Sequence, residues 1–133
     1  MQIKNNIITI IASIVSLFIF NSNLSAEEFN ISALEFSIDQ KNNIVIGEGD
    51  VEVTDSEGKL IKADKATYEK SKEFLLAEGS VEVFDVEGNI FKSDKATYDK
   101  KKERIITYEN SKLMLKEGYK LTSNKILYNI IKK

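Results

Sequence analysis

The amino-acid sequence predicts an all-β domain built from repeats of about 30 residues, and three observations lead to this prediction. The segment at 47–68 recurs almost intact at 77–98, which is an offset of 30 residues. Within both copies apolar and polar residues alternate with a period of two, as is typical of half-buried strands. The 133-residue chain contains no proline, which suits a continuous sheet because each proline removes a hydrogen-bond donor from the ladder. A fixed period of this length indicates repeat units that bury their apolar faces only by stacking on their neighbours.

A third, more divergent copy keeps the same register. Residues 117–128 follow residues 87–98 by 30 positions and again end in Tyr128. In this copy Asn124 and Ile126 replace an Asp and an Ala, and Glu109-Asn110 stands near the place where a Glu-Gly pair is expected. We expect the third copy to fold like the other two, with its second half the least regular part of the array.

The first 26 residues have the layout of a secretory signal peptide. Lys4 provides a small positive n-region, residues 7–20 are uncharged and largely apolar, and a short polar stretch ends at Ala26. We expect cleavage after Ala26 and a single domain over residues 27–133. A membrane-spanning helix needs about 20 apolar residues, so this run is short for a permanent anchor. An uncleaved anchor is the alternative, because Leu24 is not the small residue preferred at that position.

The composition argues against several classes of function. The net charge is −2 with mixed signs, whereas a nucleic-acid-binding protein would show a basic patch or stripe. Without any Cys or His, the usual zinc and copper ligands and the Ser-His-Asp and Cys-His catalytic sites are all missing. No glycine-rich loop opens a helix to hold a phosphate. The acidic turn at 55–58 supplies oxygens for calcium, but the ligand spacing of repeat-type calcium sites is absent. We therefore expect no catalytic residues, no cofactor, no metal and no nucleic-acid partner.

The strands and turns can be placed in order along the chain. Residues 29–38 alternate as a strand with a change of phase at Ala33-Leu34, and residues 39–43 form a polar turn. The strand through 45–53 places its valines and glycines on one face and its acidic residues on the other. The segment at 55–58 is a turn in which Gly58 can adopt a positive φ. Residues 121–128 form the last strand, and nothing caps it, so we expect an open edge there and at the first strand.

The strand at 60–68 predicts a corner in the sheet. Ile61 and Ala63 share one parity, whereas Ala66 and Tyr68 share the other. Both pairs face inward only if the phase slips by one residue at Asp64-Lys65, and the same pattern recurs one repeat later. A β-bulge inserts one residue, bends the strand and increases its twist. We therefore predict a bulge or corner in each copy, a sheet that curls, and structural rather than catalytic roles for the two aspartates.

A helix is the competing interpretation of residues 65–77. This stretch is rich in helix formers, and Gly79 could serve as its C-cap. The next copy, however, has Ile105, Ile106, Thr107 and Tyr108 at the matching positions, and these residue types favour a strand. Because one fold must suit both copies, we predict strands on either side of charged turns at 69–73 and 99–103.

The repeat units resemble a known family. The pattern apolar-x-(Ala/Gly)-Glu-Gly-x-Val-x-Val, then Glu-Gly, then apolar-x-(Ala/Ser)-Asp-x-Ala-x-Tyr, is similar to that of the OstA-like, organic-solvent-tolerance domain. Members of that family include the periplasmic bridge protein of lipopolysaccharide transport and the N-terminal domain of the outer-membrane lipopolysaccharide translocon. The resemblance covers residues 44–128 and rests on two clear copies of a degenerate motif.

The resemblance implies an antiparallel β-jellyroll, open like a folded taco, located in the periplasm and able to bridge the inner and outer membranes. Its apolar groove would hold the acyl chains of lipopolysaccharide (lipid A), and its edge strands would pair with other jellyroll domains or with further copies head to tail. The candidate groove residues are Val51, Val53, Ile61, Ala66, Tyr68, Leu75, Val81, Val83, Phe91, Ala96 and Tyr98.

Three alternatives to this function remain at the level of sequence. The chain could be a truncated N-terminal domain of the translocon, or a component that keeps its N-terminal helix as an inner-membrane anchor. Outside the family, the same repeats could form a β-solenoid scaffold with a filled core that only self-assembles and carries no lipid.

Overall fold

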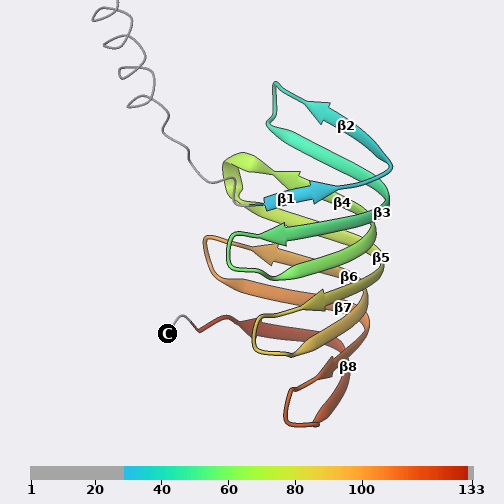
Figure 1. Cartoon of the computed structure of the whole chain (residues 1–133), viewed down its shortest axis with the longest axis vertical. Coiled ribbons are helices and arrows are strands. Elements are labelled where there is room, and N and C mark those ends of the chain that lie inside the picture. The colour runs from blue at the N-terminus through green and yellow to red at the C-terminus, as the bar shows by residue number, and fades with distance from the viewer. Residues whose placement is uncertain (1–28, 132–133) are drawn as a thin grey trace, which may run out of the picture.

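One antiparallel sheet of eight strands makes up the part of the chain described by the computed structural model, residues 29–131 (Figure 1). The expected signal peptide and its cleavage after Ala26 lie outside these residues. The elements are β1 (Phe29–Ser32), β2 (Glu35–Asp39), β3 (Ile44–Asp55), β4 (Leu60–Glu69), the 3₁₀ turn η1 (Lys70–Lys72), β5 (Phe74–Phe84), β6 (Ile90–Asp99), β7 (Arg104–Met114) and β8 (Lys120–Asn129).

Among residues 29–131, the strand order leaves the two expected edges unpaired. From β3 to β8 each strand pairs with the next one in sequence, and β8 ends the series. At the other edge, β1 pairs with the C-terminal half of β3 and β2 with its N-terminal half. The predicted phase change at Ala33-Leu34 corresponds to the break between β1 and β2, so these two short strands together occupy the place of one long strand.

Every long strand bends at the same level, which confirms the predicted corners. Ala63 and Ala66 are both buried although they differ in parity, and the strand register shifts between Lys62 and Lys65. The additional residue lies on the neighbouring strand, where Gly79 and Ser80 both have positive φ angles of 83° and 45°. The same shift recurs in β3 and β7, so the corners line up across the sheet.

The aligned corners divide the sheet into two walls. In Figure 1 the corners lie on the right and the hairpin turns lie on the left. The first wall runs from the corners to the turns at 56–58, 86–88 and 116–118, and it includes β1. The second wall runs to the turns at 40–43, 70–73 and 100–103, and it includes β2. The sheet therefore folds over on itself, with an inside, an outside and a line along which the two rows of turns meet.

The strand interpretation of residues 65–77 is correct. β4 continues to Glu69 and β5 begins at Phe74, with only the single turn η1 between them. Glu73 closes this turn in the left-handed conformation, with its N–H donating to the carbonyl of Lys70. Between residues 29 and 131, no helical segment is long and apolar enough to cross a bilayer.

Candidate functional site: an apolar interior closed by a polar seam

All the candidate groove residues point to the inside of the folded sheet and belong to one cluster of buried side chains. They are Val51, Val53, Ile61, Ala66, Tyr68, Leu75, Val81, Val83, Phe91, Ala96 and Tyr98. Ala63, expected to face inward, and Ala77 join them, and so do Phe29, Ile105 and Leu113, which are not among the candidate residues. Ile105 and Leu113 stand 30 residues after Leu75 and Val83, so a strict reading of the repeat would have found them. Phe29 precedes the recognised repeats and gave no such signal.

The two walls are in contact along this interior. Phe91 and Tyr98 are 0% and 1% exposed to solvent. The ring of Phe29 packs edge-on against Tyr68 and Tyr98, with centroid separations of 4.8 and 5.5 Å, and Phe91 packs in the same way against Tyr128 at 5.0 Å. Because these side chains leave almost no water-accessible surface between them, a guest molecule could lie among them only if the walls move apart.

The interior becomes more polar toward the third copy. Ser111 takes the inward position that Val81 holds in the second copy, and Thr107 takes that of Ala77. Both are buried, at 0% and 1% exposure. The Ser111 hydroxyl lies 3.5 Å from the carbonyl of Asn124, whereas the Thr107 Oγ1 finds no hydrogen-bond partner among the described residues. An unsatisfied buried hydroxyl costs about 1–3 kcal/mol, so this part of the interior is less stable than a purely apolar one.

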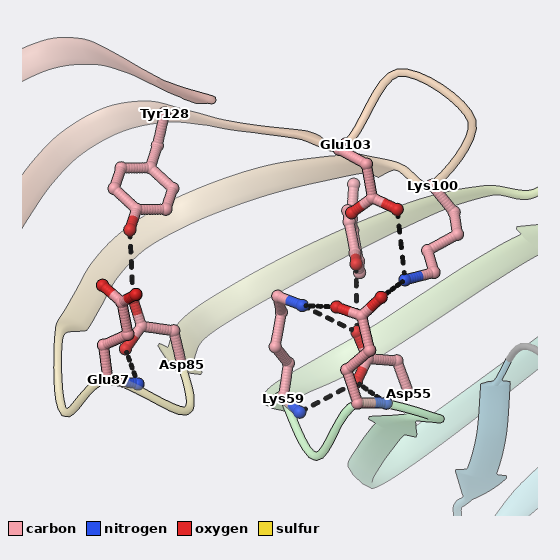
Figure 2. A network of polar contacts seen from close by, with 9 residues as sticks. Asp55, Lys59, Asp85, Glu87, Lys100, Glu103 and Tyr128 are labelled. Carbon is pink, nitrogen blue, oxygen red and sulfur yellow. Dashed lines mark hydrogen bonds and ion pairs between the residues drawn. The ribbon is translucent and has the colours of Figure 1, made fainter. Parts of the chain in front are cut away.

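The two rows of turns meet along a seam. Two contact sites lie on it within residues 29–131, and the first is strongly polar (Figure 2). We call this site, formed by the turn 55–59 and the facing residues Tyr98, Lys100 and Glu103, the first seam cluster. Tyr98 donates its phenolic hydrogen to Asp55 Oδ2 at 3.0 Å, and Lys100 Nζ donates to Glu57 Oε1 at 2.8 Å. Both contacts join residues 43 positions apart, one on each wall.

Hydrogen bonds within the turn 55–59 fix the orientation of the Asp55 carboxylate. Its Oδ1 accepts hydrogen bonds from the backbone N–H groups of Glu57 and Lys59, at 3.0 and 2.8 Å. Its Oδ2 remains available to Tyr98 and to Lys59 Nζ, which lies 3.3 Å away. This side-chain mimic of a turn is the reason why aspartate begins such turns so often. Lys59 also pairs with Glu57 at 2.7 Å, and its side chain is only 3% exposed.

Glu57 and Lys100 hold each other in their ionised forms. Hydrogen bonds from Lys100 and then Lys59 lower the pKa of Glu57 to about 2. Burial alone would lower the pKa of Lys100, but the hydrogen bond to Glu57 and the charge of Glu103, 3.4 Å away, raise it on balance. Burial, followed by the nearby charge of Asp55, raises the pKa of Tyr98. The cluster is therefore a set of matched charges across the seam.

The second contact site, the second seam cluster, repeats this turn with weaker chemistry (Figure 2). It is formed by the turn 85–89, Tyr128 and Ile130. Asp85 accepts backbone N–H groups at 2.9 and 2.8 Å as Asp55 does, but the Tyr128 hydroxyl reaches it only at 3.4 Å. Ile130 stands 30 residues after Lys100, so the second cluster has an isoleucine at the position where the first has an ammonium group. Burial and the charge of Asp85 raise the pKa of Tyr128.

A cavity of about 600 Å³ adjoins the second seam cluster. Its apolar lining comes from Val86, Tyr128, Ile130 and Ile131, and carboxylates of the two turns stand at its rim. A second hollow of about 450 Å³ continues on the other side of Val86 and Tyr128, toward Leu115. Because Tyr128 also packs on Phe91, the cavity is separated from the apolar interior by a single layer of side chains.

The repeated aspartates have structural roles at the corners. A Cβ atom added at Gly79 would lie 2.4 Å from Asp64 Oδ2 and 2.8 Å from its Cβ, so Asp64 sits directly over the glycine of the Glu-Gly pair. In the third copy Asn110 donates its side-chain N–H to Asp94 at 2.7 Å instead. Within residues 29–131, no group of three or more acidic side chains is arranged to hold a metal ion.

Comparison with known proteins agrees with this architecture. Residues 30–133 match the model of the LptA/(LptD N-terminal domain) lipopolysaccharide transport protein family. The chain belongs to this family. The crystal structure of LptH, the LptA-homologous periplasmic component of the lipopolysaccharide transport device of Pseudomonas aeruginosa, is similar in fold. The TM-score is 0.68 at 18% identity, over 76% of this chain and 75% of that one. No curated protein sequence matches the chain.

Membership of the LptA/LptD N-terminal domain family confirms two predictions made from the sequence. The resemblance drawn from the repeat motif is correct, and the all-β, antiparallel jellyroll is the fold of the family. The family is one of transport proteins, in line with the expectation that the chain is not an enzyme.

Proposed function

We propose that this protein carries lipopolysaccharide through the periplasm and that the inward residues of the jellyroll shield the lipid A acyl chains from water. The observation that supports this most directly is the single apolar cluster that runs through both walls from β1 to β7, in a sheet that is folded over on itself. Burying acyl carbons gains about 0.8 kcal/mol per CH₂ group, so a chain of about a dozen carbons gives roughly 10 kcal/mol gross. No bond needs to be made or broken by this protein.

The proposed location follows from the N-terminal sequence and the family. Residues 1–26 would direct export and be removed after Ala26, leaving residues 27–133 as the working domain. Energy for directed transport would come from a partner, because lipid binding by itself favours no direction.

The edges of the sheet support partners of the same fold. At one edge, Leu34 just before β2 and Phe36 and Ile38 within β2 are 74%, 50% and 67% exposed. At the other edge, β8 exposes Leu121 and Leu127, each 50% exposed. Long unpaired strands with apolar side chains invite pairing with another strand. We propose that other jellyroll domains of the transport bridge, or further copies of this chain head to tail, pair at these edges.

One observation favours the competing scaffold function. The inward side chains pack against each other so closely that the interior is filled in the absence of a guest. A self-assembling scaffold with a filled core would have the same appearance and the same exposed edges. The two functions differ in a single respect, which is uptake of lipid between the walls.

Photo-crosslinking to lipopolysaccharide separates them. A photoreactive phenylalanine analogue would replace Phe91 or Tyr98, with the matched control at Glu52, whose side chain points outward and is 56% exposed. Crosslinks from the two inward positions and none from Glu52 are expected of a carrier. Folded, exported protein that gives no crosslink at either inward position would sink the carrier function and leave the scaffold.

A further inference from the structure

The contacts that join the two walls are stronger at the first seam cluster than at the second. At the first seam cluster, Lys100 and Tyr98 from one wall engage Glu57 and Asp55 from the other at 2.8 and 3.0 Å. At the second seam cluster, the corresponding contact is a 3.4 Å hydrogen bond from Tyr128 to Asp85. Parting the first cluster separates the Lys100 ammonium, whose side chain is 7% exposed, from the carboxylate of Glu57, whereas parting the second exposes an isoleucine and releases a long hydrogen bond.

A cavity lies next to the second cluster. Its volume of about 600 Å³ is in the size range of cavities that bind small ligands, and its lining extends from Tyr128 and Ile130 to Glu57 and Lys59 of the first seam cluster. Val86, Ile130 and Ile131 give it an apolar lining, and Tyr128 connects it to Phe91 in the interior. One inward position beyond the Ile105–Tyr128 pair lies the unpartnered hydroxyl of Thr107. Weak closure, an apolar cavity and a poorly satisfied interior therefore occur together in the third copy.

The rim of the cavity shows which part of a lipid it suits. Asp85, Glu87 and Glu57 line the cavity with carboxylates, and the Lys59 ammonium group in its lining already pairs with Asp55 and Glu57. Carboxylates repel phosphate, so a phosphorylated head group would be held away from this point. An uncharged alkyl chain meets no such barrier and gains the burial of its methylene groups against the isoleucines.

From these observations we propose that acyl chains enter and leave the jellyroll through the second seam cluster, between Glu87 and Ile130, while the first seam cluster stays closed and holds the walls together. This inference rests on the carrier function proposed above and adds the place at which the cargo passes. It assigns Val86, Tyr128, Ile130 and Ile131 as the first protein surface that an incoming acyl chain touches.

Bridging the two clusters one at a time tests this assignment. The chain has no native cysteine, so the pairs Glu87→Cys/Ile130→Cys and Glu57→Cys/Lys100→Cys can each be joined by a short, reducible bis-maleimide. Uptake of fluorescent lipopolysaccharide is then measured before bridging, after bridging and after reduction. We expect the 87–130 bridge to lower uptake at least tenfold and reduction to restore it, whereas the 57–100 bridge leaves uptake within twofold of the unbridged protein.

The outcomes separate the two levels of the proposal. Normal uptake in the 87–130-bridged protein, or equal inhibition by both bridges, would overturn the assignment of the opening while leaving the carrier function intact. No uptake by unbridged, wild-type protein would overturn the carrier function and this inference with it.

A second measurement leaves the side chains that close the seam unchanged. Val86 and Ser56 occupy equivalent, exposed positions in the two turns, 30 residues apart. With a photoreactive residue at either position, we expect crosslinks to lipopolysaccharide at Val86 early in loading and none at Ser56. Early crosslinks at Ser56 alone would refute an opening at the second cluster.

Discussion

Replacing Lys100 with methionine tests whether the first seam cluster holds the two walls together. Methionine keeps the apolar stem but removes the ammonium group that donates to Glu57 at 2.8 Å and lies 3.4 Å from Glu103. Removing one partner of a fully buried ion pair costs about 3–5 kcal/mol. The Lys100 side chain is 7% exposed but that of Glu57 is 36% exposed, so water can partly solvate the abandoned carboxylate and the cost falls to about 2 kcal/mol.

The assay is thermal unfolding followed by circular dichroism at pH 7. A loss of about 2 kcal/mol in a domain of this size lowers Tm by about 10 °C. Lys102→Met is the matched control, because Lys102 is an exposed neighbour in the same turn, and its Tm should stay within about 2 °C of wild type. Combining Lys100→Met with Glu57→Gln completes a double-mutant cycle, for which we expect a coupling free energy of about 1–2 kcal/mol.

The pH dependence provides an independent check with a defined sign. Folding lowers the pKa of Glu57 from 4.5 to about 2, so the carboxylate contributes stability above pH 4.5 that is lost as the pH falls toward 2. The Tm difference between wild type and Lys100→Met should therefore be full at pH 7 and shrink below pH 4.5. A coupling free energy near zero, or a Tm difference that persists at pH 2, would show that this ion pair does not hold the seam.

Three further variants follow from other parts of the structure. Gly79→Ala places a methyl group against Asp64 at a φ of +83° and should lower the free energy of unfolding in urea by about 2–3 kcal/mol. Its control is Gly118→Ala, at a φ of +98° with nothing within 4 Å, which should lower it by about 1 kcal/mol. Equal losses in the two variants would mean that the contact with Asp64 is unimportant. Thr107→Val removes an unpartnered buried hydroxyl at nearly constant volume and should raise the free energy of unfolding by about 1 kcal/mol, and a loss of stability would reveal a hidden partner. Ile38→Lys on the open edge strand should reduce concentration-dependent association in sedimentation velocity, and unchanged association would exclude that edge as the contact.

The fold could be predicted from the sequence because its main signals are local and repeated. The parity change between Ala63 and Ala66 predicts a corner, and the repeat at 93–96 confirms it, since one backbone must serve both copies. This change of parity shows only that one extra residue is present in the strand pairing. It does not say which strand carries the extra residue, and the left-handed pair Gly79-Ser80 lies on the neighbouring strand.

The seam could not be predicted, because it joins residues 43 positions apart in a chain that repeats every 30. Lys100 belongs to a charged turn that looks fully solvated in the sequence, yet its side chain is 7% exposed. The one available signal was indirect. Asp55 and Tyr98 recur as Asp85 and Tyr128, and that joint recurrence has a meaning only once the sheet is known to fold over.

The alignment of the corners has a mechanical consequence for the edges of the sheet. Each long strand crosses from one wall to the other, so the angle between the walls is also the bend within β8, and β1 and β2 follow the same bend at the opposite edge. A guest that widens the interior at the second seam cluster would straighten the strands beside it, including β8 at the edge. A neighbouring domain that pairs along β8 has to match that bend. The loaded and empty forms would therefore offer this neighbour an edge strand with two different bends. In such an assembly, the shape of the joint would report whether cargo is present.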